Sequence, residues 1–256
     1  METKLIDHLK SLAEKYERKE FLLGDPSWFM HQVNGDTNKE LLAFIASSIS
    51  YGSRKQFLPK IDSLGLTNDN SGQGDTIDIA NWLVSGSFND VVPPIDECFY
   101  RLYTKKTFNS FLSALAIMVK EYGDIKNYLA TNMKSNEALE AIALLTKWFV
   151  NHDSIGVIPK DTTSSCKRVC MFLRWMVRDN SPVDLGLWSD IIDKRTLIIP
   201  MDTHVVQEAN RLGLMKKATT SMSAARKLTK TLSEIFPEDP LKGDFALFGL
   251  GVDEKI

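Results

Sequence analysis

Apolar residues recur at three- and four-residue spacing through most of the chain, and this spacing limits the fold more than any other feature of the sequence. Each such segment places its apolar side chains on one face of an α-helix, and short breaks rich in Gly, Pro, Asn or Asp separate the segments. The helices predicted in this way cover residues 5–19, 39–51, 54–65, 76–86, 93–103, 108–122, 136–151, 167–177, 203–214, 222–236 and 244–251. No segment predicts a strand, and residues 196–200 (TLIIP) are better explained as an extended loop. We therefore predict an all-α protein.

The length and composition are those of a globular protein. With 256 residues, the chain can form one large domain or two lobes that share an interface. No apolar run approaches the roughly 20 residues needed to cross a bilayer, and the mixed-charge N-terminus lacks the apolar core of a signal peptide. Three cysteines are too few for a disulfide framework, so a cytoplasmic location is expected. Cys166 and Cys170 have no second ligand pair nearby, and neither a metal nor another cofactor is expected.

Positive charge is concentrated in two segments although the net charge is only −2. Residues 160–178 carry five cations and one carboxylate, and residues 203–231 carry six cations and one carboxylate. These segments are net +4 and +5, so the rest of the chain is net −11. The two segments are where an anionic partner would be held. The alternative is that they form a solvated basic face with no partner.

Lys167 is the first candidate for a functional residue in these basic segments. Thr163 or Ser164 is a natural N-cap, which would place Lys167 in the first turn of the following helix. The helix dipole and the adjacent Arg168 both disfavour an ammonium there, so we expect the pKa of the lysine amine to be lowered. A lysine with more free amine is a better nucleophile. The alternative is that its side chain only reaches into solvent.

Asp202 is the second candidate for a functional residue. It follows Pro200 and begins the segment 203–214, and an aspartate in this position is a standard helix N-cap. Capping alone would explain it. A carboxylate held rigidly at a cleft could also accept a proton or stabilise a developing cation. His204, two residues further on, fits a hydrogen-bonding or packing role, and Gly213 is in the right place to end the helix.

Four segments carry a resemblance to a known family. They are FIASSISYGSRKQFLPKI, CKRVCMFLRWMVRDNSPVDLGLW, IIPMDTHV and DFALFGLG. They resemble recurrent segments of an uncharacterised bacterial family related to the helix-hairpin-helix DNA glycosylases, and this similarity covers nearly the whole chain. A lysine early in one helix, then PMDTHV and RLGL, also resembles endonuclease III and the 8-oxoguanine glycosylases.

The resemblance implies a fold and a reaction. The fold would be a two-lobed, helical, helix-hairpin-helix glycosylase-like unit with an interlobe cleft, divided into residues 37–150 and residues 1–36 plus 151–256. The reaction would be excision of a flipped, damaged base from double-stranded DNA, or cleavage at an abasic site. Lys167 matches the lysine that forms the Schiff base, and Asp202 matches the catalytic aspartate.

Further positions follow from the same comparison. The candidates for DNA contacts are Arg54, Lys55, Ser164, Ser165, Arg168, Lys216 and Lys217. The candidates for walls of a base pocket are Tyr51, Trp188 and His204, whereas the spacing of Phe172 and Trp175 assigns them to the core. The residues before Lys167, DTTSSC, lack the Gly-x-Gly turn that usually holds a phosphate. The four-cysteine loop of endonuclease III is also missing, so no iron–sulfur cluster is expected.

Two other functions compete with this one. A non-catalytic DNA-binding module of the same fold would use the same basic surfaces, with Lys167 as a phosphate contact. A metal-dependent phosphohydrolase is suggested by His31 and the pair His152–Asp153, but its pattern needs the first histidine much closer to that pair. Retention of both Lys167 and Asp202 favours the enzyme.

Overall fold

The described part of the chain is mostly helical, with one small two-stranded sheet. A computed structural model describes residues 3–67, 77–217 and 219–253, and in these ranges the prediction of an all-α protein is confirmed. Contacts divide the chain into unit 1, made of residues 1–23, 135–142 and 162–256, and unit 2, made of residues 24–134 and 143–161. The expected division had placed 24–36 and 151–161 with the C-terminal part and 135–142 with the central part. None of the described helices is both long and apolar enough to cross a membrane.

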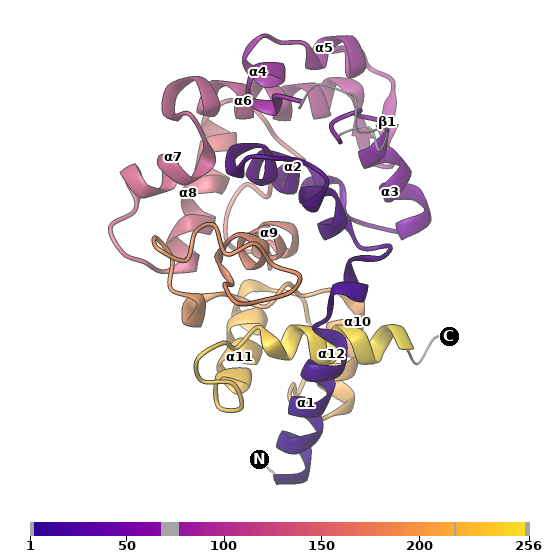
Figure 1. Cartoon of the computed structure of the whole chain (residues 1–256), viewed down its shortest axis with the longest axis vertical. Helices are drawn as coiled ribbons and strands as arrows, with labels where there is room; N and C mark the ends of the chain where they lie inside the picture. The colour runs from indigo at the N-terminus through magenta and orange to yellow at the C-terminus, as the bar shows by residue number, and fades with distance from the viewer. Residues whose placement is uncertain (1–2, 68–76, 218, 254–256) are drawn as a thin grey trace. The chain divides into compact units, whose positions relative to one another are not determined.

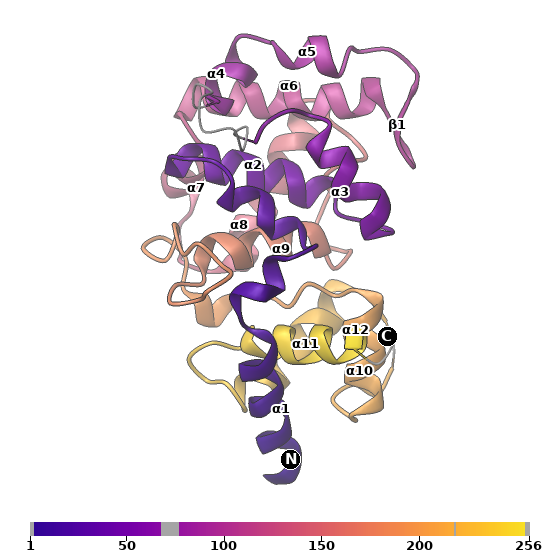
Figure 2. The same cartoon turned by 45° about the vertical axis from the view of Figure 1, so that its right-hand side comes forward.

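Unit 2 is built around helix α2 (Asp36–Ile49), which is buried on nearly all sides. Its Phe44 ring lies 5.7 Å from Phe111 of α6 and 5.6 Å from Phe149 of α8, measured between ring centroids. Helices α4 and α5 cover α6 (Figure 2). The helical elements of this unit are η2 (Pro26–His31), α2, α3 (Arg54–Asp62), α4 (Ile79–Val84), α5 (Phe88–Val91), α6 (Lys105–Tyr122), α7 (Ile125–Asn132) and most of α8 (Ala138–Asn151).

One predicted helix of unit 2 is wrong. The segment 93–103 was expected to be helical, but it contains the strand β1 (Cys98–Tyr100), which pairs antiparallel with β2 (Tyr103–Thr104). Arg101 adopts φ +51° in the turn between them. Three aromatic residues in five positions favour extended backbone, and the two-residue turn closes the hairpin. These local preferences outweigh the tendency of Pro93 and Pro94 to begin a helix.

Unit 1 is organised on its last helix, α12 (Lys242–Asp253), which packs against α1 (Thr3–Tyr16) and α10 (Thr203–Arg211) (Figure 1). Two glycines of the DFALFGLG segment allow the close approach. A Cβ atom on Gly249 would lie 2.2 Å from Cγ of Tyr16, and one on Gly251 would lie 2.9 Å from Cβ of His204. The remaining helical elements of this unit are η1 (Lys19–Leu22), α9 (Lys167–Val177), η3 (Lys194–Thr196), α11 (Met222–Ser233) and the first turn of α8.

Helix α9 is buried from Val169 to Val177, and the connector that follows it folds back on its end. The backbone N–H groups of Leu185 and Trp188 donate to the carbonyls of Trp175 and Met176, each at 2.7 Å. These bonds satisfy carbonyls that the end of a helix leaves without an intrahelical partner. The expected extended loop at residues 196–200 is confirmed over its last four residues, since Thr196 closes η3 and no helix or strand includes the rest.

Candidate active site

Lys167 is the first helical residue of α9, and the residue before it has an unusual backbone. The N-cap is Cys166, which is in the left-handed region at φ +47° and makes no side-chain capping bond. The expectation that Thr163 or Ser164 caps this helix is therefore wrong, although Lys167 does lie in the first turn as predicted. A left-handed non-glycine residue is strained, and such strain tends to be retained at functional positions. Cys166 adopts the conformation that a glycine would adopt more easily.

Ser164 is committed to a different interaction. Its backbone forms an isolated antiparallel bridge with Ser221, the N-cap of α11. Its hydroxyl accepts a hydrogen bond from the backbone N–H of Cys166 at 3.4 Å. Ser164 is exposed whereas Ser165 is buried, so the hydroxyl of Ser165 does not face solvent as a DNA contact would require. The bridge places the starts of α9 and α11 side by side.

Asp202 caps α10 as predicted. Its Oδ1 atom accepts a hydrogen bond from the backbone N–H of Val205 at 2.8 Å, and Gly213 follows the end of the helix with φ +72°. The loop before it is anchored by a 3.0 Å bond from the N–H of Ile199 to the hydroxyl of Thr229 in α11. The carboxylate is half-buried. Asp202 is therefore fixed by its cap at one oxygen and by a tethered loop behind it.

The buried carboxyl of Asp244 in α12 interacts with α9 and with the cap of α10. Arg174 of α9 donates to it from Nη1 at 2.5 Å. Burial raises the pKa of Asp244 to about 6 against the opposing effect of Arg174, and the nearby carboxylate of Asp202 raises it further. Asp244 in turn raises the pKa of the buried Cys170 thiol, after the larger effects of burial and of Cys166. Asp244 is therefore linked to α9 through Cys170 and Arg174, and to α10 through the Asp202 carboxylate.

Arg174 and Arg178 belong to a buried ion cluster. Nη1 of Arg178 donates to Asp184, and its Nε and Nη2 donate to Asp239 at 2.7 to 3.1 Å. Nη2 also donates to Glu17 at 2.7 Å. Arg174 is ion-paired with Asp184 at 3.3 Å and with Asp244. The ion cluster thus comprises two guanidinium groups and four carboxyl groups, from Glu17, Arg174, Arg178, Asp184, Asp239 and Asp244.

This cluster corrects the charge argument made from the sequence. The net charge of +4 over residues 160–178 included Arg174 and Arg178, which are both buried and paired inside unit 1. Arg211 is likewise paired with Glu208 at 2.6 Å. An anionic partner would instead meet the exposed cations of the α10–α11 segment.

The candidates for a base pocket are in three different environments. Trp188 is only 1% exposed and lies edge-on to Phe172, with 5.0 Å between centroids, so stacking on a base would require the core to open. His204 is half-buried beside Phe248, with 5.9 Å between ring centroids. Tyr51 is in unit 2, where its hydroxyl donates to the carbonyl of Tyr100 at 3.1 Å. Phe172 and Trp175 are fully buried, which confirms their assignment to the core.

Arg54 and Lys55 also lie in unit 2, at the start of α3. Arg54 is ion-paired with Asp25 at 3.5 Å, and Lys55 is exposed. The other DNA-contact candidates, Lys216 and Lys217, are exposed in unit 1 between α10 and α11. The candidates therefore divide between the two units, with Lys167 and Asp202 both in unit 1.

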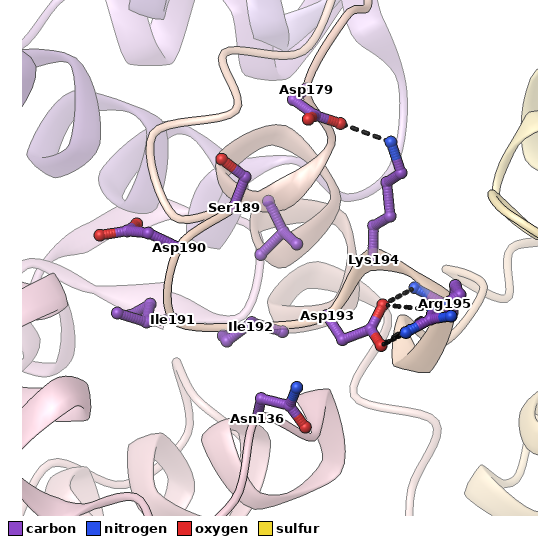
Figure 3. Close-up of a pocket in the computed structure, with 10 residues that line it drawn as sticks. Asn136, Asp179, Ser189, Asp190, Ile191, Ile192, Asp193, Lys194 and Arg195 are labelled. Atoms are coloured by element: carbon purple, nitrogen blue, oxygen red, sulfur yellow. Dashed lines mark hydrogen bonds and ion pairs between the residues drawn. The ribbon is translucent and has the colours of Figure 1, made fainter.

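A pocket that the sequence did not indicate lies in the connector after α9 (Figure 3). It has a volume of about 310 Å³ and is lined by Asn136, Val177, Asp179 and residues 189–195. Two ion pairs occupy its rim, Lys194 with Asp179 at 2.6 Å and Arg195 with Asp193 at 2.7 Å. Neither Lys167 nor Asp202 lines it. Within the described part of the chain, no three His, Cys, Asp or Glu side chains are placed to hold a metal ion.

Comparison with known proteins gives a family but no activity. A model of one protein family, described as "Protein of unknown function (DUF2400)", matches residues 25–253. No curated protein and no solved structure was found to match the chain. A function therefore has to be argued from the side chains themselves.

Proposed function

We propose that this chain, which belongs to the DUF2400 family of proteins of unknown function, is a DNA N-glycosylase with abasic-site lyase activity. Its substrate would be cytoplasmic double-stranded DNA that carries a damaged base or an abasic site. The two units would correspond to the two lobes of a helix-hairpin-helix glycosylase-like fold. Lys167 would be the nucleophile, and Asp202 would activate it.

One observation supports this proposal more than any other. A lysine at the first position of α9 and a carboxylate at the N-cap of α10 belong to the same unit, and the buried Asp244 interacts with both helices, through Arg174 of α9 and through Asp202. Each residue alone has an ordinary structural explanation. Two helix starts in one unit, on helices linked by one buried carboxyl, would supply the two groups that the reaction needs, an amine and a rigidly held acceptor for its proton.

The chemistry follows from these two groups. Asp202 accepts a proton from the Lys167 ammonium, and the free amine attacks C1′ of a nucleoside flipped out of the helix. The C1′–N bond to the base breaks as the new N–C1′ bond forms, and the departing base takes up a proton. The Asp202 carboxylate stabilises the positive charge that develops on the sugar. Ring opening then gives a Schiff base, and loss of a C2′ proton expels the 3′ phosphate by β-elimination.

The surroundings of Lys167 suit a phosphate backbone. The start of α9 is half-buried at Lys167 and Arg168, and Ser164 is exposed three residues before Lys167. The first backbone N–H groups of the helix would be the donors to a phosphate there. Helix N–H groups would replace the Gly-x-Gly turn that the sequence lacks. Lys216 and Lys217 are exposed in the segment that leads to Ser221, the bridge partner of Ser164.

Borohydride trapping tests the nucleophile directly. The protein is incubated with duplexes that carry 8-oxoguanine, uracil, an oxidised pyrimidine or an abasic site, and borohydride is added to reduce any Schiff base. We expect a covalent adduct with at least one duplex in the wild type and in Lys242→Gln, and none in Lys167→Gln. Lys242 is the matched control because it is exposed at the first position of α12 in the same unit.

Two substitutions of Asp202 separate its structural role from its chemical one. Asp202→Asn can still cap α10, so its stability should fall by a few tenths of a kcal/mol at most, whereas trapping should fall by orders of magnitude. Asp202→Ala should lose about 1 kcal/mol of stability as well. An adduct that survives in Asp202→Asn at the wild-type rate would refute the role given to this carboxylate.

A non-catalytic DNA-binding module is the second candidate, and the exposed cations of unit 1 favour it because they do not depend on Lys167 as a nucleophile. It predicts DNA binding without an adduct on any of the four duplexes. That outcome would replace the enzyme with the binding module.

A further inference from the structure

Helix α11 carries a row of cations along its exposed side. Arg226, Lys227 and Lys230 are all exposed, whereas Met222, Ala225, Leu228, Thr229 and Leu232 are buried. Position 230 is four residues after position 226 and three after position 227, so Lys230 neighbours both Arg226 and Lys227 on the helix surface. Lys216 and Lys217 are exposed in the segment before it. We name these five residues the α11 basic row: Lys216, Lys217, Arg226, Lys227 and Lys230.

The row has no acidic partners among the residues that the structure describes, whereas five other cations of unit 1 do. Arg174, Arg178, Lys194, Arg195 and Arg211 are each ion-paired with a carboxylate. No residue of the α11 basic row takes part in an ion pair with any residue that the structure describes, and α11 itself contains no acidic residue. Cations at this spacing repel one another on a helix. An external anion would remove that repulsion.

The position of the row relative to α9 indicates which anion fits. Helix α11 begins next to Ser221, whose backbone is bridged to Ser164, three residues before Lys167. From Arg226 to Lys230 the helix rises about 6 Å. A DNA strand carries one phosphate for about every 3.4 Å of helix axis. The cations on α11 therefore match the spacing of about two consecutive phosphates of one strand, on a helix whose N-cap is bridged to the segment before α9.

We infer that the α11 basic row binds the sugar–phosphate backbone of duplex DNA next to the nucleotide that Lys167 attacks. This inference rests on the proposed function for the identity of the ligand, and it adds the surface that holds the flanking strand. The contacts are ionic and independent of base sequence. The row fixes the register of the duplex, and the reacting groups remain at the starts of α9 and α10.

The salt dependence of DNA binding tests the row without any reaction. A 20-base-pair duplex with a tetrahydrofuran abasic-site analogue is titrated with protein at 50 to 300 mM KCl, and the dissociation constant is read from fluorescence anisotropy. Lys227→Gln/Lys230→Gln should reduce the slope of log affinity against log salt by about 2, which is on the order of 60-fold weaker binding at 0.1 M salt. Lys4→Gln/Lys10→Gln on α1 removes the same charge from exposed lysines of the same unit and should leave the slope unchanged.

Two outcomes would overturn the inference. One is a slope for Lys227→Gln/Lys230→Gln equal to that of the wild type or matched by the control. The other is a change of slope with single-stranded DNA only. Borohydride trapping keeps this test separate from the proposed function. An adduct with an unchanged slope refutes the row alone, whereas a reduced slope without any adduct refutes the enzyme and leaves the row as the surface of a DNA-binding module.

Discussion

The buried ion cluster gives the strongest prediction about stability, through the substitution Arg178→Met. The guanidinium is 1% exposed and contacts Asp184, Asp239 and Glu17. Burial would lower the pKa of this guanidinium, but its carboxylate neighbours raise it instead. Methionine has a similar volume and no charge, so the substitution leaves the carboxylates in place and removes the cation that holds them together.

The size of the destabilisation follows from the carboxylates that remain buried without this cation. Removing one partner of a buried ion pair destabilises a protein by about 3–5 kcal/mol, because the other charge has no compensation. We expect Arg178→Met to fall in that range, out of a total stability of about 5–15 kcal/mol. The free energy of unfolding of Arg178→Lys should lie between those of Arg178→Met and the wild type, since a lysine keeps the charge but cannot form the forked set of hydrogen bonds.

The defect should also depend on pH. Burial raises the pKa of Asp184 in the folded state, and Arg174 and Arg178 oppose that effect. A carboxyl whose folded pKa exceeds its unfolded value contributes stability at low pH that is lost as the pH rises through the folded pKa. Without Arg178 this pKa rises further, so the defect of Arg178→Met should be largest near pH 8 and smaller near pH 5.

Urea denaturation at both pH values measures these effects. Arg195→Met is the matched control, because Arg195 forms a forked pair with Asp193 at the surface, where solvent screens the charges and loss of the pair should change stability little. If Arg178→Met proved no more destabilising than Arg195→Met, the ion cluster would not be what holds unit 1 together. The same conclusion would follow from a defect that grows toward pH 5.

Two other substitutions probe α12. Asp244→Asn removes a buried carboxyl whose pKa is raised to about 6. The free energy of unfolding of the wild type should therefore fall by up to about 3 kcal/mol relative to that of the variant as the pH rises from about 4 to about 8. Urea denaturation of both proteins across that range measures this difference, and equal pH dependence of the two free energies would contradict the prediction. Gly249→Ala should lower the melting temperature by several degrees because its Cβ would lie 2.2 Å from the Tyr16 ring, a clash worth about 1–3 kcal/mol. Alanine otherwise favours helix. An unchanged or higher melting temperature would therefore show that α1 can shift away from the added methyl group without loss of stability, against the prediction.

Helical periodicity predicted most of the fold because burial on one face determines these elements locally. The cap of α10 at Asp202, its end at Gly213 and the burial of Phe172 and Trp175 all follow from short-range patterns. The hairpin at residues 98–104 was missed because its two strands are too short for alternation to be visible. Local patterns are informative where the determining contacts are close in the sequence.

The site was less predictable because its determining contacts are distant in the sequence. Asp244 meets Arg174 across 70 positions, and Ser164 pairs with Ser221 across 57, so neither partner is visible from local spacing. Those contacts explain two errors. Ser164 forms a backbone bridge with Ser221, the N-cap of α11, instead of capping α9, and Arg174 is neutralised in the interior instead of adding to a basic surface. Charge counts along a sequence cannot distinguish a buried cation from an exposed one.

The start of α9 is where local and distant effects oppose each other. From the sequence, the helix dipole and Arg168 are expected to disfavour an ammonium on Lys167. The ion cluster contains more carboxyl than guanidinium groups, and the Asp202 carboxylate lies next to its member Asp244. This excess of negative charge favours a cation near Asp244. The proposed reaction would need two conditions one after the other: an amine that loses its proton before attack, and a site that stabilises positive charge on the sugar afterwards. In that proposal Asp202 would serve both, by accepting the first proton and by adding to the negative potential around Asp244.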